Sequence, residues 1–298
     1  MTLLGNAKAV WQWMFSAQAE TTPAAVAGTL RQYAPGTAVV LVKVMDGQDW
    51  QASYDTGQRA PRSLTDWQAL QAEGANAGVT LVPWVVANTP TDAAAHARLR
   101  PALVVDLEPY AGFWSGAPIR RLKPEKAVNP WAAAAQDVPQ YLRTLRAGGV
   151  QQIFASIDPR PAAVQALGVA DWAGMVDGLL PEVYWPDFQQ PAMSCLGLVR
   201  SLRALSPNIY PALPYDAAAA DLAAFWEACR GIGCSGCSLW RLGAANAVQL
   251  QAFGALAVPA ANPCAQIEQQ LAAVTAERDR LKAAVQAMVA AGQGALAY

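Results

Sequence analysis

The sequence predicts an α/β fold in which eight strands form a (β/α)8 TIM barrel, followed by a C-terminal coiled-coil helix. Three observations support this prediction. Eight short β-like runs lie between residues 9 and 242, amphipathic alanine-rich segments separate most of them, and a heptad pattern begins after residue 264. Strand–helix alternation repeated eight times favours a barrel over an open sheet.

The eight β-like runs are mostly continuous in β-branched and aromatic residues, which is typical of parallel strands covered on both faces. They are AVWQWMF (9–15), AVVLVKV (38–44), VTLVPWVV (79–86), ALVVDLE (102–108), QIFASID (152–158), GLLPEVYW (178–185), NIYPALPY (208–215) and SGCSLWRL (235–242). A doubly wound sheet is the alternative, although no G-x-G-x-x-G or P-loop follows the first run.

Helical patterns lie between these runs, several with glycine at or just after the expected end. They are TPAAVAGTLRQY (22–33), SLTDWQALQAEGANAG (63–78), DVPQYLRTLRAGG (137–149) and AADLAAFWEACRG (219–231). The longest connection follows the fourth run and contains GFWSGAPIRRLKPEKAVNPW (112–131). In a barrel this loop lies on the catalytic face.

The pattern divides the chain into a barrel (1–257), a linker (258–264) and a helix (265–298). Spacings of four and three residues in the helix predict a coiled coil that makes the protein a homo-oligomer through residues 265–290. A solvated helix or one packed on the barrel is the alternative. The a and d positions are Ile267, Leu271, Val274, Arg278, Leu281, Val285 and Met288.

Composition excludes several classes of function. The chain is 54% hydrophobic and 14% charged with a net charge of −1, which argues against disorder and against a nucleic-acid-binding surface. No apolar run is long enough to span a bilayer. The first residues lack a basic segment before an apolar core, so no signal peptide is expected. A cytoplasmic or phage-borne protein is the default, and export without a classical leader is the alternative.

Cysteines and histidine limit the chemistry further. Five cysteines in a domain of this size do not predict a disulfide framework. Cys234 and Cys237 form a C-x-x-C pair, read as small buried hydrophobic residues rather than as a zinc or redox site. The single histidine, His96, is expected at the surface or half-buried on a helix. Triads that require histidine are therefore disfavoured, no metal or cofactor is predicted, and carboxylates and tyrosines remain as acid–base groups.

Acidic and aromatic residues gather where the predicted strands end, the edge that carries the site in a barrel. Asp106 and Glu108 lie two apart on one strand and so point to the same side. Their proximity and burial should raise one pKa, as a general acid requires. The alternative is that they cap a barrel layer as solvated acids. The candidate substrate-binding residues are Asp46, Trp84, Asp158, Glu182, Trp185, Tyr215, Asp216 and Trp240.

Here the sequence resembles glycoside-hydrolase TIM barrels, especially family 25 lysozymes and family 18 chitinase-like proteins. VVDLEPY (104–110) resembles their Asp-x-Glu at the end of strand four, which implies Glu108 as the acid and Asp106 as its partner. EVYW (182–185) resembles the strand-six segment of the chitinase-like proteins, which implies that Tyr184 assists the substrate's acetamido group. Trp240 takes the place of the aromatic residue under the sugar. The chain departs from the families at WQW (11–13), Val104 and Trp185.

The function predicted from these features is hydrolysis of a polysaccharide, peptidoglycan or another amino-sugar polymer, by carboxylate acid catalysis. Asp46, Glu182, Asp216 or the substrate's own acetamido group is the second catalytic group. The alternative is a non-catalytic glycan-binding or structural barrel of a phage or surface assembly, with avidity from the coiled coil. Lys43, inside an apolar run, is expected to pair with Asp106 or Glu108, and a Schiff-base lyase is the remaining possibility.

Overall fold

The computed structural model describes residues 3–5, 7–17, 21–107 and 137–258, and the helical positions 278, 282 and 285. The chain divides into two compact units, of which Thr2–Pro259 contains the barrel and the other contains Ala260–Tyr298. Most of the predicted coiled coil and Glu108 lie outside the described residues. Within those residues, no helix has the length and apolar character needed to cross a bilayer.

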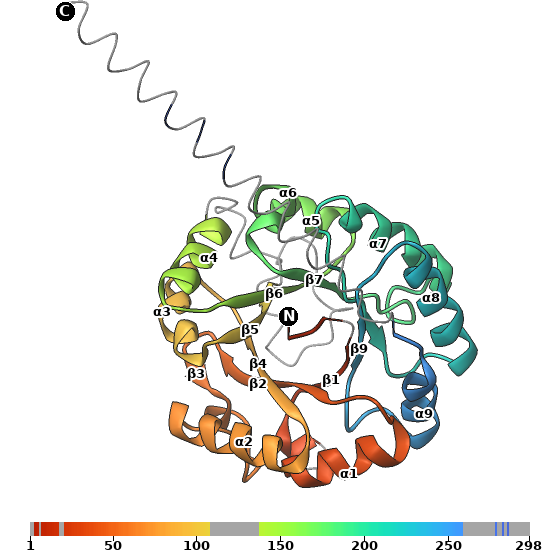
Figure 1. Cartoon of the computed structure of the whole chain (residues 1–298), viewed down its shortest axis with the longest axis horizontal. Coiled ribbons are helices and arrows are strands. Elements are labelled where there is room, and N and C mark those ends of the chain that lie inside the picture. Colours follow the sequence, from red (N-terminus) through yellow and green to blue (C-terminus); the bar gives the residue numbers. More distant parts are fainter. Residues whose placement is uncertain are drawn as a thin grey trace, which may run out of the picture. The chain divides into compact units, whose positions relative to one another are not determined.

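Eight parallel strands of the described residues form a nearly closed barrel, as predicted. Their order around the sheet is β7-β6-β5-β4-β2-β1-β9-β8, and bridges from Leu179 to Ile209 and from Glu182 to Ala212 join its two edges. This ring excludes the doubly wound alternative (Figure 1). The parallel strands are β1 (Lys8–Gln12), β2 (Val39–Asp46), β4 (Thr80–Val86), β5 (Ala102–Leu107), β6 (Gln152–Ile157), β7 (Gly178–Pro181), β8 (Ala212–Pro214) and β9 (Cys237–Trp240).

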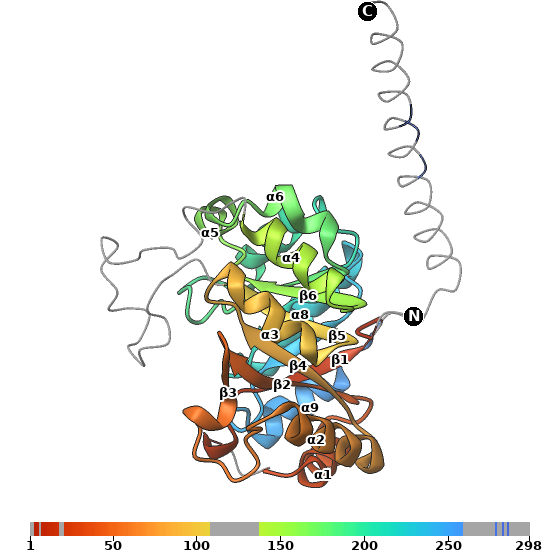
Figure 2. The same cartoon turned by 90° about the vertical axis from the view of Figure 1, so that its left-hand side faces the viewer.

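Helices surround the strands, with α1 and α2 on one side of the barrel and α4, α5 and α6 on the opposite side (Figure 2). The helices are α1 (Pro23–Tyr33), α2 (Leu64–Ala77), α3 (Ala93–His96), α4 (Asp137–Ala147), α5 (Pro161–Ala166), α6 (Val169–Trp172), α7 (Leu196–Arg203), α8 (Ala219–Gly231) and α9 (Ala247–Ala255). Short 3-10 turns occur at Phe15–Ala17, Gln51–Ser53, Pro90–Asp92, Ala97–Leu99, Ala173–Met175 and Ala192–Cys195. The four helical patterns of the sequence correspond to α1, α2, α4 and α8.

Local sequence explains where the first helices begin and end. The Thr22 hydroxyl accepts a hydrogen bond from the backbone N–H of Ala25, and Pro23 occupies the first turn of α1. Ser63 caps α2 in the same way, through the N–H of Asp66. Gly78 ends α2 with a φ of 82°, a left-handed conformation that costs glycine little.

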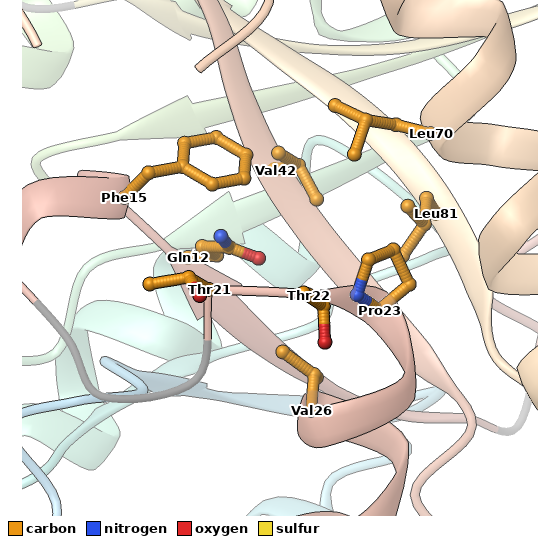
Figure 3. Close-up of a pocket in the computed structure, with 9 residues that line it drawn as sticks. All are labelled: Gln12, Phe15, Thr21, Thr22, Pro23, Val26, Val42, Leu70 and Leu81. Atoms are coloured by element: carbon orange, nitrogen blue, oxygen red, sulfur yellow. The ribbon is translucent and has the colours of Figure 1, made fainter. Parts of the chain in front are cut away.

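Side chains alternate along each strand between the barrel interior and the layer under the helices. The interior contains a buried cluster that includes Leu41, Val82, Val104 and Phe154. The larger cluster lies between strands and helices. A cavity of about 10 Å³ in that outer layer is lined by Gln12 and by apolar side chains from β2, α1 and α2 (Figure 3). Gln12 therefore faces outward, and Trp11, its neighbour on β1, faces inward.

One irregularity changes this alternation in β2. Lys43 pairs in register with Trp84, but the next pair joins Met45 to Val85, so Val44 is an extra residue in the strand. Val44 and Met45 both pack in the outer layer. A two-residue strand, β3 (Asp49–Trp50), then pairs antiparallel with the end of β2.

Candidate active site

The interior side chains at the C-terminal ends of the strands form the candidate site. Val104 is in the interior cluster while Val105 and Leu107 are in the outer layer, which places Asp106 in the interior. After β7 the same alternation directs Glu182 and Tyr184 inward, with Val183 outward. Parallel strands thus bring residues 76 positions apart in sequence to one end of one barrel.

Asp106 and Glu182 form an acidic pair on either side of β6. The strand register places Asp106 beside Ser156, and the Ser156 hydroxyl donates a 2.9 Å hydrogen bond to Oε1 of Glu182. Asp106 is 5% exposed, and its Oδ1 has no hydrogen-bond partner among the described residues. Such an oxygen is costly to bury as a carboxylate and less costly as a neutral acid.

Burial therefore keeps protons on this pair. Burial raises the pKa of Asp106 to about 7. The nearby Lys43 ammonium opposes this rise, and the negative charge of Asp46 adds to it. Burial also raises the pKa of Glu182 well above its ordinary range, and the neighbouring Asp106 adds to the effect while the Ser156 hydrogen bond opposes it. A carboxyl group whose pKa is raised toward neutral pH is what general acid–base catalysis requires.

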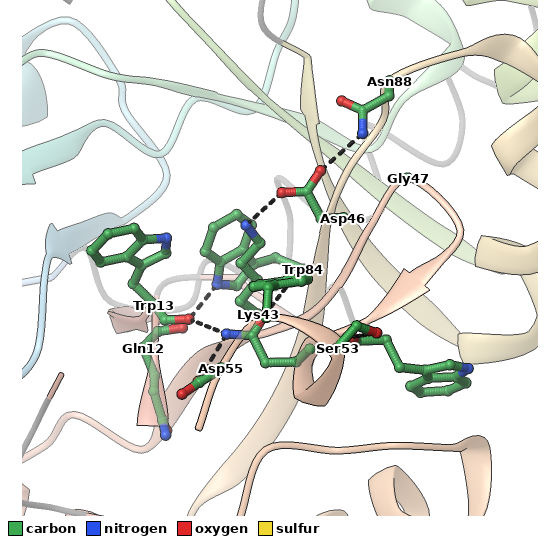
Figure 4. A network of polar contacts seen from close by, with 12 residues as sticks. Gln12, Trp13, Lys43, Asp46, Gly47, Ser53, Asp55, Trp84 and Asn88 are labelled. Atoms are coloured by element: carbon green, nitrogen blue, oxygen red, sulfur yellow. Dashed lines mark hydrogen bonds and ion pairs between the residues drawn. The ribbon is translucent and has the colours of Figure 1, made fainter. Parts of the chain in front are cut away.

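Lys43 and Asp46 form an ion pair next to Asp106. Lys43 is 1% exposed, and its Nζ lies 2.9 Å from Oδ2 of Asp46 (Figure 4). The Asn88 side-chain amide donates a 2.8 Å hydrogen bond to Oδ1 of Asp46. The sequence predicts that Lys43 pairs with Asp106 or Glu108, but the ion pair that the structure shows joins it to Asp46, three residues along the same strand. Asp46 is held by two groups rather than presented to solvent.

Tryptophan rings from three strands fill the centre of the barrel under this end. Trp11, Trp84 and Trp240 contact one another edge to face, with ring centroids 5.5–6.0 Å apart. Trp84 is 1% exposed and donates its indole N–H to the backbone oxygen of Gln12. Trp240 is half-exposed, and the Tyr184 ring lies 6.2 Å away from it at an angle of 30°. The solvent-facing aromatic pair is therefore Trp240 and Tyr184, supported by Trp84.

The remaining predicted substrate-binding residues occupy different places. Asp158 is buried and accepts hydrogen bonds from the backbone and side chain of Arg160, in the turn that precedes α5. Tyr215 is half-buried just after β8, and Asp216 is exposed. Trp185 is 4% exposed and packs on Phe225 of α8, in the outer layer. The structure does not bring Trp185 to the other residues, because it follows the inward-facing Tyr184.

His96 corrects one expectation. It is fully buried rather than at the surface or half-buried, with Nδ1 2.6 Å from the Tyr141 hydroxyl and Nε2 2.6 Å from the Gly47 backbone oxygen. A carbonyl only accepts, so Nε2 carries the proton and Nδ1 accepts from Tyr141. Burial lowers the pKa of His96 and keeps the ring neutral. The helix α3 is a single turn, too short for hydrophobic spacing to reveal which of its residues is buried.

Tyr54 is the residue near the site that the sequence pattern did not indicate. It follows β3, and its ring centre lies 5.1 Å from Nζ of Lys43, while its hydroxyl donates to Oε1 of Gln51. The described cysteines, Cys195, Cys229, Cys234 and Cys237, are free and buried, as expected of small hydrophobic residues. Within the described part of the chain, no group of three metal-ligating side chains is placed to hold an ion.

In a comparison with solved structures, the fold is similar to the barrels of several proteins that are described as carbohydrate-active enzymes. A glycoside hydrolase family 5 enzyme from Prevotella bryantii superposes with a TM-score of 0.54 at 10% identity, covering 84% of this chain and 95% of the other. A family 18 N-acetylglucosaminidase from Paenibacillus barengoltzii gives 0.53 at 10% identity, covering 83% and 98%. The spore cortex-lytic enzyme SleL of Bacillus megaterium gives 0.50 at 9% identity, covering 87% and 75%. No family model matches the sequence, and no curated protein is similar to it in sequence.

The class of protein that the fold defines is the eight-stranded parallel α/β barrel. At about 10% identity this likeness establishes the architecture.

Proposed function

We propose that this protein is a glycoside hydrolase that cleaves a polysaccharide by carboxylate acid–base catalysis. The observation that supports it best is the Asp106–Glu182 pair, whose raised pKa values place exchangeable protons at the C-terminal end of the barrel. The half-exposed rings of Trp240 and Tyr184 lie at the same end and offer apolar faces to a sugar ring.

The two acids suit different tasks at neutral pH. Glu182 holds its proton and can donate it to the oxygen of a leaving sugar, whereas Asp106 is partly ionised near pH 7 and can accept one. Glu108, predicted from the resemblance as the acid, lies outside the described residues and stays part of the proposal. Asp46 is a weaker candidate for the second carboxylate, because Lys43 and Asn88 already occupy its oxygens.

The substrate we propose is an amino-sugar polymer such as peptidoglycan or chitin. Tyr184 would assist the acetamido group of such a substrate, as the resemblance to chitinase-like proteins implies. Of the structural neighbours, the Paenibacillus barengoltzii protein is an N-acetylglucosaminidase and SleL is a spore cortex-lytic enzyme. Both descriptions agree with this choice of substrate.

The test is release of reducing ends from peptidoglycan, chitin and plain glucans by the intact chain and by single amide variants. E182Q, D106N and E108Q each remove one acid with little change of shape. E227Q is the matched control, since Glu227 is exposed on α8 and pairs with Arg230. Loss of release in one or more of the three, with E227Q unchanged, supports the proposal and identifies the acids. Release that survives all three substitutions contradicts it.

A non-catalytic glycan-binding barrel is the second candidate. The end of β1 favours it, because Trp13 is half-exposed there, at the place where the lysozymes that the sequence resembles carry an aspartate. Polymer binding by co-sedimentation without any release of reducing ends would select this function. Residues 265–290 remain the predicted oligomerisation segment, which light scattering on the full chain and on a chain ending at residue 258 would test.

A further inference from the structure

Arg241 lies at the mouth of the barrel, where β9 ends, near the rings of Trp13 and Trp240. It follows Trp240 at the end of β9, which pairs with β1. Its guanidinium carbon lies 4.4 Å from the centre of the Trp13 ring and 5.9 Å from that of Trp240. Trp13, Trp240 and Arg241 are all half-exposed, so the planar cation and both rings can contact a molecule in the mouth.

The charge of Arg241 is not compensated by a carboxylate within the described part of the chain. Five other arginines of that part each form an ion pair with an aspartate or glutamate, namely Arg59, Arg62, Arg146, Arg160 and Arg230. Burial lowers the pKa of Arg241, which is the sign of a cation that has lost water. A half-buried cation without a counter-ion is unfavourable, and an anionic ligand would relieve that cost.

The shape of the guanidinium also indicates which anion fits. A guanidinium has a planar N–H edge that can donate two parallel hydrogen bonds, the geometry that a carboxylate accepts, and the Trp13 ring 4.4 Å from its carbon can help to hold it in place. The rings of Trp13 and Trp240 can stack on a sugar, which places an acidic group and a pyranose face within reach of one cluster.

We infer that Arg241, with Trp13 and Trp240, binds the carboxylate of an acidic sugar and so selects a carboxylated glycan as the substrate. This inference rests on the proposed function in naming the substrate, although the binding itself requires no catalysis. The carboxylate can belong to a uronic acid, where it is attached to C5, or to a muramic acid, where it belongs to the lactyl ether on C3. Both present the same planar anion beside a pyranose ring.

The experiment is calorimetric titration of the intact protein with sugars matched except for the charge. One pair is methyl glucuronide and methyl glucoside, and the other is N-acetylmuramic acid and N-acetylglucosamine. In wild type, at least one acidic sugar should bind about tenfold more tightly than its neutral partner, and the preference should weaken in salt. The pair that shows the preference distinguishes the two sources of the carboxylate.

Substitutions then assign the preference to Arg241. R241Q should abolish it and leave binding of the neutral sugar within about twofold, whereas R241K should recover little because lysine lacks the planar fork. R200Q is the matched control, since Arg200 is exposed on α7. Melting temperatures of all three variants show whether they are folded.

The outcomes separate this inference from the proposed function. A charge preference that R241Q removes supports the inference even if no polymer is cleaved. Equal binding of both members of each pair, no binding of either acidic sugar at tens of millimolar, or a preference that survives in folded R241Q overturns it, whether or not reducing ends are released.

Discussion

The hydroxyl of Ser156 donates a 2.9 Å hydrogen bond to Oε1 of Glu182. Ser156 is on β6, the strand that lies between Asp106 and Glu182, so the bond connects this strand to one of the two acids. This bond favours the charged form of Glu182 and opposes the effect of burial on its pKa. Without it the pKa of Glu182 rises further, because nothing replaces the donor. Ser156 is fully buried, and its side chain is small enough for removal to leave the barrel intact.

We therefore expect S156A to move the alkaline limb of the pH–rate profile to higher pH if Glu182 is the proton donor. The measurement is reducing-end release from the best polymer between pH 4 and 10. S201A is the control, since Ser201 is exposed on α7 and bonds only within its helix. An alkaline limb at the same pH in S156A would assign the titrating acid to another residue.

Asp106 should make the folded protein less stable as the pH rises. The pKa of Asp106 is about 7 in the folded chain and 3.8 ordinarily. Its contribution to the free energy of unfolding is therefore greatest below pH 4 and is lost as the pH rises through 7. D106N should remove this loss and raise stability at pH 8 relative to wild type by roughly 1–4 kcal/mol. Urea denaturation at pH 5 and pH 8 measures it, with D221N on the surface of α8 as control.

His96 should have the opposite dependence on pH. The pKa of His96 is lowered in the folded state. Its contribution to the free energy of unfolding is therefore present above pH 6.5 and is lost as the pH falls through the lowered pKa. H96N should be less stable at pH 7.5, since it disturbs the bonds to Tyr141 and Gly47, but should lose less on acidification than wild type. Melting curves from pH 7.5 to 5 would show this, and parallel curves for both proteins would contradict it.

Substitutions of Lys43 and Asp46 should have non-additive effects on the free energy of unfolding. K43M leaves a carboxylate without its ammonium partner and should cost about 3 kcal/mol, whereas the double variant K43M/D46N should recover most of the loss. K43M should also raise the pKa of Asp106, because the ammonium holds it down. A double-mutant cycle by urea denaturation gives the coupling, and additive effects of the two substitutions would show that the pair contributes nothing.

Trp185 and Trp240 should differ in what their loss impairs. W185A removes a ring packed on Phe225 and should cost about 3–5 kcal/mol, with normal activity per folded molecule. W240A removes a half-exposed ring at the mouth and should raise KM or abolish binding of the polymer. Chemical denaturation and kinetics on both variants decide the assignment. Weakened substrate binding in folded W185A would show that Trp185 takes part in binding the substrate.

The sequence predicted the barrel well because the determining signal is local. Continuous apolar runs and capped amphipathic helices specify each strand–helix unit, and the circular order follows from repeating the unit. The site was less predictable. Trp185 looked equivalent to Tyr184 in EVYW, yet a period of two places them on opposite faces. The burial of His96 and the position of Tyr54 depend on contacts between distant segments, which periodicity does not encode.

The extra residue in β2 determines which charged side chains of that strand face the barrel interior. Because Val44 and Met45 both point outward, Lys43 and Asp46 both face the barrel interior, three residues apart. In a regular strand, positions separated by three lie on opposite faces. The bulge therefore keeps the Asp46 carboxylate inside next to the Lys43 ammonium, and deleting Val44 would keep it there too, because the two residues would then lie two apart in a regular strand. Loss of the bulge without loss of a residue is the change that would alter the charge of the barrel interior, because Lys43 and Asp46 would then face opposite sides of the strand.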